Sequence, residues 1–109
     1  MTGAYTVIFS DEAEDDLLRL FDFALLRELE RATGDLRVPE HAIEAIRTGC
    51  NLLAHSPFTC RKAPPGNSSF VRELLIPFGA HGYVALFEIV DGTRVIVGAV
   101  RHQREDDYR

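Results

Sequence analysis

The stretch GYVALFEIVDGTRVIVGAVRHQREDDYR, residues 82–109, decides the fold of this chain. Two apolar, β-rich runs, Tyr83 to Val90 and Arg94 to Val100, flank Asp91-Gly92-Thr93, where glycine would allow the positive φ of a tight turn. The pattern predicts a hairpin of two antiparallel strands. The second strand passes directly into the polar segment 101–104, and groups at the end of a rigid strand are well placed to contact a partner.

A strand and a helix are predicted upstream of this hairpin. Residues 5–9 alternate and are β-rich, which indicates a first strand. Ser10 or Asp11 is expected to cap a helix that ends at Gly34, and Asp11 with Glu14 has the spacing of a capping box. The apolar positions of this helix recur at helical spacing: Ala13, Leu17, Leu20, Phe21, Ala24, Leu25 and Leu29. We expect the opposite face to be solvated: Glu12, Asp15, Asp16, Arg19 and Asp22.

A second helix, a loop and a further strand are predicted in the middle of the chain. Pro39 opens the helix, because the missing N–H of proline costs nothing in a first turn. Its apolar seam has helical spacing and ends near residues 55–57: Ile43, Ile46, Cys50 and Leu53. The segment from Phe58 to Ser69 is rich in proline and glycine and is predicted to be a loop. A strand from Phe70 to Ile76 follows, with Pro77 and Gly79 expected to end it.

The order β-α-α-β-β-β predicts a single α+β domain spanning residues 1–109. Sequential strands joined by short links pair antiparallel, so we expect a small, mainly antiparallel sheet. The first strand is expected at an edge of the sheet or between other strands. The two helices form an antiparallel hairpin that covers one face of the sheet and leaves the other face open.

Composition and charge exclude several classes of protein. No apolar run approaches the roughly 18 residues that span a bilayer, and the N-terminus lacks the pattern of a secretory signal. We therefore expect a cytoplasmic protein without membrane contact. The net charge is −5, whereas a general nucleic-acid binder carries a basic excess, so we expect no direct DNA binding.

Neither the cysteines nor the histidines indicate a metal site, and we expect no metal and no cofactor. Cys50 lies on a helical apolar seam, and Cys60 stands beside two bases that could lower its thiol pKa; both are expected to be free thiols without a role. The four histidines have no metal-ligand spacing: His41, His55, His81 and His102. No partnered nucleophile is visible, and His102 is expected to be a structural, hydrogen-bonded residue. Tyr83 and Phe87 are expected in the core.

Five ordered segments resemble the RelE/ParE superfamily of toxins from type II toxin–antitoxin systems, and ParE toxins most closely. They are the capped first helix after YTVIF, the seam Asn51 to Pro57, the strand Phe70 to Leu74, the strand Gly82 to Phe87, and the ending Val100 to Arg104. The last of these, VRHQR after an apolar strand, is the sharpest. The resemblance implies the toxin of a plasmid-stabilisation system.

The superfamily contains two activities, and the residues favour one of them. The resemblance implies that a RelE-type member cuts messenger RNA on the ribosome, and that a ParE-type member inhibits DNA gyrase. Val84 and Gln103 stand where the nuclease pattern has arginines. Losing a charge that stabilises a phosphate transition state costs about 3 kcal/mol per group, so we expect a gyrase inhibitor and not an enzyme.

Two alternatives remain open at this point. A ribosome-dependent endoribonuclease of the RelE type would use these residues: Arg72, Arg101, Arg104 and Tyr108. A degenerate, non-toxic module that only binds its antitoxin is the other alternative, motivated by Val84 and the acidic balance.

The resemblance also implies the interaction surfaces. A ParD-like antitoxin, disordered alone and folding on binding, would form a hetero-oligomer with the toxin. Its expected contacts lie on the helical hairpin: Leu17, Phe21, Leu25, Ile43 and Ile46. The expected contacts with the target, DNA gyrase, lie on the sheet and the C-terminal segment: Arg72, Arg101, His102 and Arg104.

Overall fold

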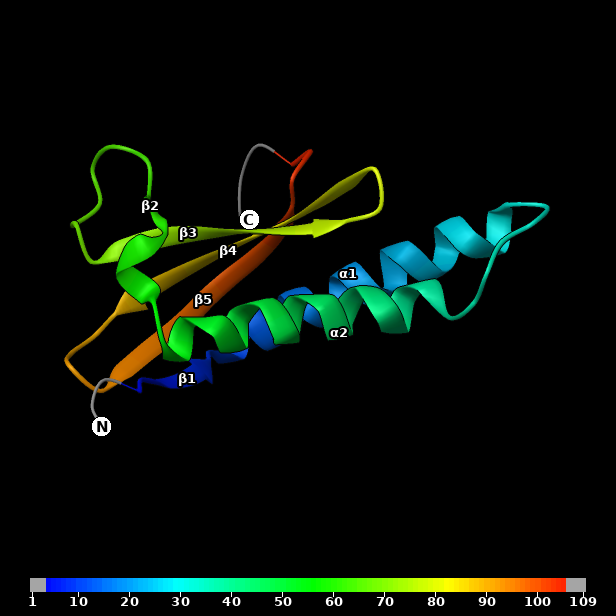
Figure 1. Ribbon diagram of the computed structural model, residues 1–109. Helices are drawn as coiled ribbons and strands as arrows, with labels where there is room; N and C mark the ends of the chain where they lie inside the picture. The colour runs from blue at the N-terminus through cyan, green and yellow to red at the C-terminus, as the bar shows by residue number, and fades with distance from the viewer. Residues whose placement is uncertain (1–3, 106–109) are drawn as a thin grey trace.

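The computed structural model describes residues 4–105 and contains two helices and a five-stranded sheet (Figure 1). The elements follow in the order β1 Thr6–Phe9, α1 Asp11–Glu30, α2 Val38–Asn51, β2 Arg61–Lys62, β3 Val71–Phe78, β4 His81–Ile89 and β5 Arg94–His102. Two short 3₁₀ turns, η1 Leu52–Ala54 and η2 Pro57–Thr59, connect α2 to β2. The predicted α+β architecture is confirmed.

The sheet has the strand order β1-β5-β4-β3-β2. The pairs β2–β3, β3–β4 and β4–β5 are antiparallel, and β1 lies at the edge, parallel to β5. The predicted hairpin is therefore the centre of the sheet. A β-bulge between Leu86 and Phe87 shifts the register of β4 against β5.

The two helices pack side by side on one face of the sheet (Figure 1). The core between them is formed by one side of β4 and β5 and by the buried faces of both helices. Tyr83 and Phe87 belong to this core, as predicted. The connection between α1 and α2 projects beyond the β3–β4 turn (Figure 1). This projection leaves the C-terminal half of α1 without a sheet beneath it.

The start of α1 differs from the predicted capping box. Ser10 caps the helix, because its hydroxyl accepts a hydrogen bond from the backbone N–H of Ala13 at 3.1 Å. Glu14 does not complete a box; its carboxylate pairs with Arg47 of α2 at 2.8 Å. The helix ends at Glu30, before Gly34. A Cβ at Gly34 would overlap the carbonyl oxygen of Glu28, so only glycine allows this close approach.

Asp16 was predicted on the solvated face of α1, and this is wrong. Asp16 is only 5% exposed, and its carboxylate accepts a hydrogen bond from the backbone N–H of Val100 at 2.8 Å. The reason lies in the length of β1, which pairs with β5 only as far as Val97. Beyond that point the outer edge of β5 has no strand beside it, and polar side chains take the place of one.

Three side chains complete this edge. The Ser10 hydroxyl donates to the carbonyl of Gly98 at 3.2 Å. An Arg19 Nη donates to the carbonyl of Val100 at 3.4 Å, and the Glu105 carboxylate accepts from the backbone N–H of His102 at 2.8 Å. The α1 helix therefore holds the last third of β5 in the sheet.

The other side of the sheet corrects two predictions. Part of the predicted loop forms strand β2, where Arg61 pairs with the buried carboxylate of Glu73 at 2.9 Å. Strand β3 continues through Pro77, which was expected to end it. Because β2 is only two residues long, β3 is an edge strand at Pro77, and the missing N–H removes no ladder hydrogen bond.

The β4–β5 turn is held by a side chain and not by a left-handed glycine. Among the residues described, positive φ occurs at Gly66 and Gly79 and not at Gly92. The Asp91 carboxylate instead accepts from the backbone N–H of Thr93 at 2.8 Å and pairs with Arg94 at 2.9 Å. The N–H of Thr93 and the Arg94 guanidinium together lower the pKa of Asp91 to about 2.

We predict that Asp16→Ala destabilises the fold by about 1–3 kcal/mol, because the N–H of Val100 is left buried without its acceptor. Asp15→Ala is the matched control: the neighbouring carboxylate is exposed and its loss should change stability by less than about 0.5 kcal/mol. Urea unfolding of both variants measures the difference. Equal stability of the two variants would contradict the assigned role of Asp16.

Candidate functional site

The predicted C-terminal cluster forms a tight turn at the end of β5. One Nη of Arg101 donates to the carbonyls of His102 at 3.2 Å and of Glu105 at 2.6 Å. The Nδ1 of His102 accepts from the backbone N–H of Arg104 at 3.1 Å. Arg101 thus stabilises the turn, His102 is hydrogen-bonded as predicted, and the side chain of Arg104 is exposed.

Arg72 lies far from this turn along the sheet. It pairs in register with Phe87, so it is on the helix-covered side of β3 and not on the open face. Its guanidinium donates to the carbonyls of Phe58 and Cys60, each at 3.0 Å, and lies 5.3 Å from the centre of the Phe58 ring. Arg72 therefore anchors the segment before β2, and the structure does not bring it together with Arg101 and Arg104.

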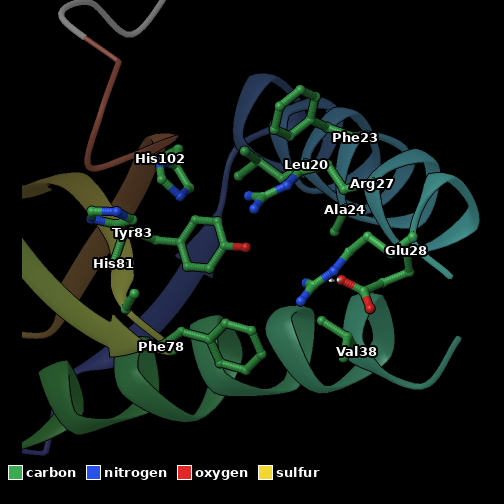
Figure 2. A pocket seen from close by; sticks show the side chains of 13 residues that line it. Leu20, Phe23, Ala24, Arg27, Glu28, Val38, Phe78, His81, Tyr83 and His102 are labelled. Atoms are coloured by element: carbon green, nitrogen blue, oxygen red, sulfur yellow. Dashed lines mark hydrogen bonds and ion pairs between the residues drawn. The ribbon is translucent and has the colours of Figure 1, made fainter. Parts of the chain in front are cut away.

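A groove lies between α1 and the adjoining ends of β3, β4 and β5. It contains two connected hollows of about 360 and 380 Å³, which share Leu20, Phe23, Arg27 and His102. The first hollow continues toward Phe78, His81, Tyr83 and Val38 (Figure 2). The second continues toward Arg19, Arg104 and Glu105. We call these two hollows together the α1–β5 groove.

Aromatic rings line the sheet side of the α1–β5 groove. The His102 ring lies 5.5 Å from the Tyr83 ring and 5.9 Å from the His81 ring, both edge to face. The Tyr83 hydroxyl points into the cavity toward α1 (Figure 2). Burial raises the pKa of Tyr83. Burial, followed by repulsion from His81, lowers the pKa of His102, while Glu105 acts against this shift.

The helical hairpin presents a different set of residues from those predicted to bind an antitoxin. Leu17 and Ile46 are 3% and 0% exposed, so their side chains offer almost no surface to a partner. Phe21, Leu25 and Ile43 are half-buried. A stripe on the outer face of α1 is exposed instead, and we call it the α1 stripe: Leu18, Leu26 and Leu29, at 67%, 58% and 59%.

Both cysteines are thiols, as predicted. Burial raises the pKa of Cys50 to about 12. It also raises the pKa of Cys60, which the neighbouring bases were expected to lower. The contrary effect of Arg72 on Cys60 is smaller than that of burial, so neither thiol is activated for chemistry.

The described part of the chain holds neither a candidate metal centre nor a candidate membrane span. Within residues 4–105, His, Cys, Asp and Glu side chains nowhere gather in threes as a metal ion would need. The helices in the same range are too short or too polar to cross a bilayer. Tyr108, the predicted nuclease tyrosine, lies outside the described residues.

Comparison with protein families decides the identity of the chain. Residues 7–107 match the family model described as the ParE toxin of the type II toxin–antitoxin system parDE. The chain belongs to the ParE toxin family. The predicted resemblance is confirmed, and the protein is a ParE-type toxin of a type II toxin–antitoxin system. No curated protein matches the chain.

A solved structure supports the ParE fold. The chain is similar to a protein chain in a structure titled "Chromosomal ParDE TA system from P. aeruginosa", with a TM-score of 0.69. The two share 15% sequence identity, and the match covers 93% of this chain and 98% of that chain. At this identity the likeness concerns the fold.

The residues that α1 contributes to the α1–β5 groove were not predicted from the sequence. Phe23 and Arg27 line both hollows, and Phe23 is 55% exposed. Phe23 falls outside the apolar seam of α1, and a large aromatic residue off the seam was the available signal. Its proximity to His102 could not be inferred, because it depends on how α1 crosses β5.

We predict that His102 makes the protein less stable as the pH is lowered below about 6.5. Its folded-state pKa lies below the ordinary value of 6.5, so the unfolded state takes up the proton first and gains from it. Stability is then lost as the pH falls from about 6.5 toward the lowered pKa, and His102→Gln should flatten this dependence. An NMR titration of His102 with a midpoint at or above 6.5 would contradict the prediction.

Proposed function

We propose that this ParE-type toxin arrests cell growth in the cytoplasm by inhibiting DNA gyrase, and that a ParD-like antitoxin neutralises it. The observation that carries the proposal is the placement of the three arginines that a nuclease would need. Arg72 lies on the helix-covered side of β3, Arg101 pairs in register with Val84 on the opposite face, and Arg104 lies in the terminal turn. Arg72 is thus on the other face of the sheet from Arg101 and does not face a common phosphate with it.

The position of Val84 supports the same conclusion. This residue stands where the nuclease pattern has an arginine, and it is only 2% exposed. Phosphate chemistry depends on several charges preorganised around one transition state. A buried aliphatic side chain at this position supplies none, and Arg72 and Arg101 already donate to backbone carbonyls.

The proposed antitoxin contact is centred on the α1 stripe, because Leu17 and Ile46 of the expected set are buried. An exposed row of leucines on one helix is suited to an apolar segment that folds on binding. Asp15 and Asp22 are exposed on the same side of α1. The antitoxin segment would therefore combine apolar anchors with flanking basic residues. Phe21, Leu25 and Ile43 are half-buried, and their exposed parts would extend this contact.

Purified toxin should inhibit gyrase supercoiling at micromolar concentration, and cells expressing it without antitoxin should stop growing. Transcripts from these cells should show no new cleavage sites inside ribosome-covered codons, as mapped by primer extension. Cleavage at such sites together with unaffected supercoiling would establish the nuclease alternative. Undiminished growth together with unaffected supercoiling would establish the non-toxic alternative.

The antitoxin contact is tested by Leu26→Glu. Because burying one leucine contributes about 1.5–3 kcal/mol, the affinity for the antitoxin, measured by calorimetry, should fall by about tenfold to a hundredfold. Leu52→Glu is the control, since Leu52 is 65% exposed at the far end of the hairpin. Equal affinities of the two variants would exclude the α1 stripe from the contact.

A further inference from the structure

Two arginines without an internal partner meet at the α1–β5 groove. Within residues 4–105, Arg27 and Arg104 are the arginines whose guanidinium groups make no ion pair or hydrogen bond. The other eight have partners: Arg19, Arg31, Arg37, Arg47, Arg61 and Arg94 pair with acids, and Arg72 and Arg101 donate to carbonyls. Both unpaired arginines line the same hollow.

The charge of the groove is therefore positive although the protein as a whole is acidic. Arg19 is balanced by Glu105 at 3.2 Å, and Arg31 is balanced by Glu28 at 3.3 Å. The charges of Arg27 and Arg104 remain, and they come from elements far apart in the sequence. The rings of His81 and His102 line the first hollow beside these charges.

The floor between these cations is apolar. Leu20 and Phe23 line both hollows, and Tyr83 and Phe78 line the first (Figure 2). An exposed phenylalanine beside unpaired cations, in a concave surface, has the chemistry of a recognition site for an apolar anchor flanked by carboxylates.

We propose that the α1–β5 groove binds an acidic segment of the target protein, with Phe23 contacting its apolar anchor and Arg27 and Arg104 pairing with its carboxylates. This inference rests on the proposed toxin function and adds α1 to the target-contacting surface. His102 is shared between the groove and the terminal turn, so the two form one continuous surface.

The two sides of α1 differ in charge, which distinguishes the two partners. The α1 stripe is accompanied by Asp15 and Asp22 and suits a basic antitoxin segment. The groove lies on another side of the same helix and carries Arg27 and Arg104. One segment with a single charge pattern does not complement both, so we assign the groove to the target.

A peptide fits the groove better than a nucleic acid does. Nucleic-acid binding draws on many uncompensated bases, whereas this groove has two and the protein has a net charge of −5.

The site is tested directly with a fluorescein-labelled, glutamate-rich peptide that carries a central phenylalanine. Fluorescence anisotropy should show that Arg27→Glu and Arg104→Glu each weaken its binding by about tenfold, and NMR should place the shift changes at Phe23 and His102. Lys62→Glu is the matched control: Lys62 is also exposed, has no ion pair in the described chain, and lies on β2. Urea unfolding verifies that each variant folds, with Arg27→Gln as a milder substitution.

Several outcomes of the peptide experiment would overturn the proposal. They are binding too weak to detect, an equal loss in Lys62→Glu, equal binding of the same peptide with glutamine in place of glutamate, or displacement of the peptide by a short RNA at lower concentration than by unlabelled peptide.

Growth arrest then distinguishes the target from the antitoxin. At equal protein level, Arg27→Glu should relieve growth arrest and leave antitoxin affinity unchanged. Retained arrest with lost antitoxin affinity would overturn the assignment of the groove.

The wild-type protein separates the groove from the choice of gyrase as the target. Growth arrest by the wild type without gyrase inhibition would refute gyrase as the target, while relief of that arrest by Arg27→Glu would still support the groove. A wild-type protein that leaves growth untouched would overturn both.

Discussion

The hydrogen bond from the Val100 N–H to the Asp16 carboxylate is the contact on which the functional end of the molecule depends. Strand β1 stops pairing at Val97, and the remaining edge of β5 would otherwise be an unpaired strand edge. Asp16 and Arg19 of α1 supply the acceptor and the donor that a neighbouring strand would supply. A helix thereby completes a sheet.

This arrangement sets the position of α1 as well as that of β5. Asp16 and Arg19 hold the first half of α1 against the end of β5, and the C-terminal half of the helix extends beyond the sheet (Figure 1). The groove is the space left between them. The ion pair between Arg19 and Glu105 ties the turn to the helix. The same contacts that satisfy an edge strand therefore bring Arg27 toward His102 and Arg104.

Much of the fold could be predicted from local pattern. The β4–β5 hairpin, the helical seams and the burial of Tyr83, Phe87 and Cys50 follow from periodicity, because each records which side of an element faces the core. Predictions about single polar residues succeeded less often. Asp16 looks like part of a solvated acidic face, and only the shortness of β1 makes it a buried acceptor. Arg72 looks like an exposed base, and its register opposite Phe87 directs it to backbone carbonyls.

The sequence by itself determined the order of the elements apart from strand β2, the hairpin and the family, since the segments that carry them are contiguous and keep their pattern without tertiary context. The tertiary structure alone decided which polar groups are satisfied and which are left for a partner. Arg27 and Arg104 are far apart in the chain and look no different from the other arginines. They differ because, within residues 4–105, the fold places an acid or a carbonyl beside each of the other arginines, while these two line a shared groove.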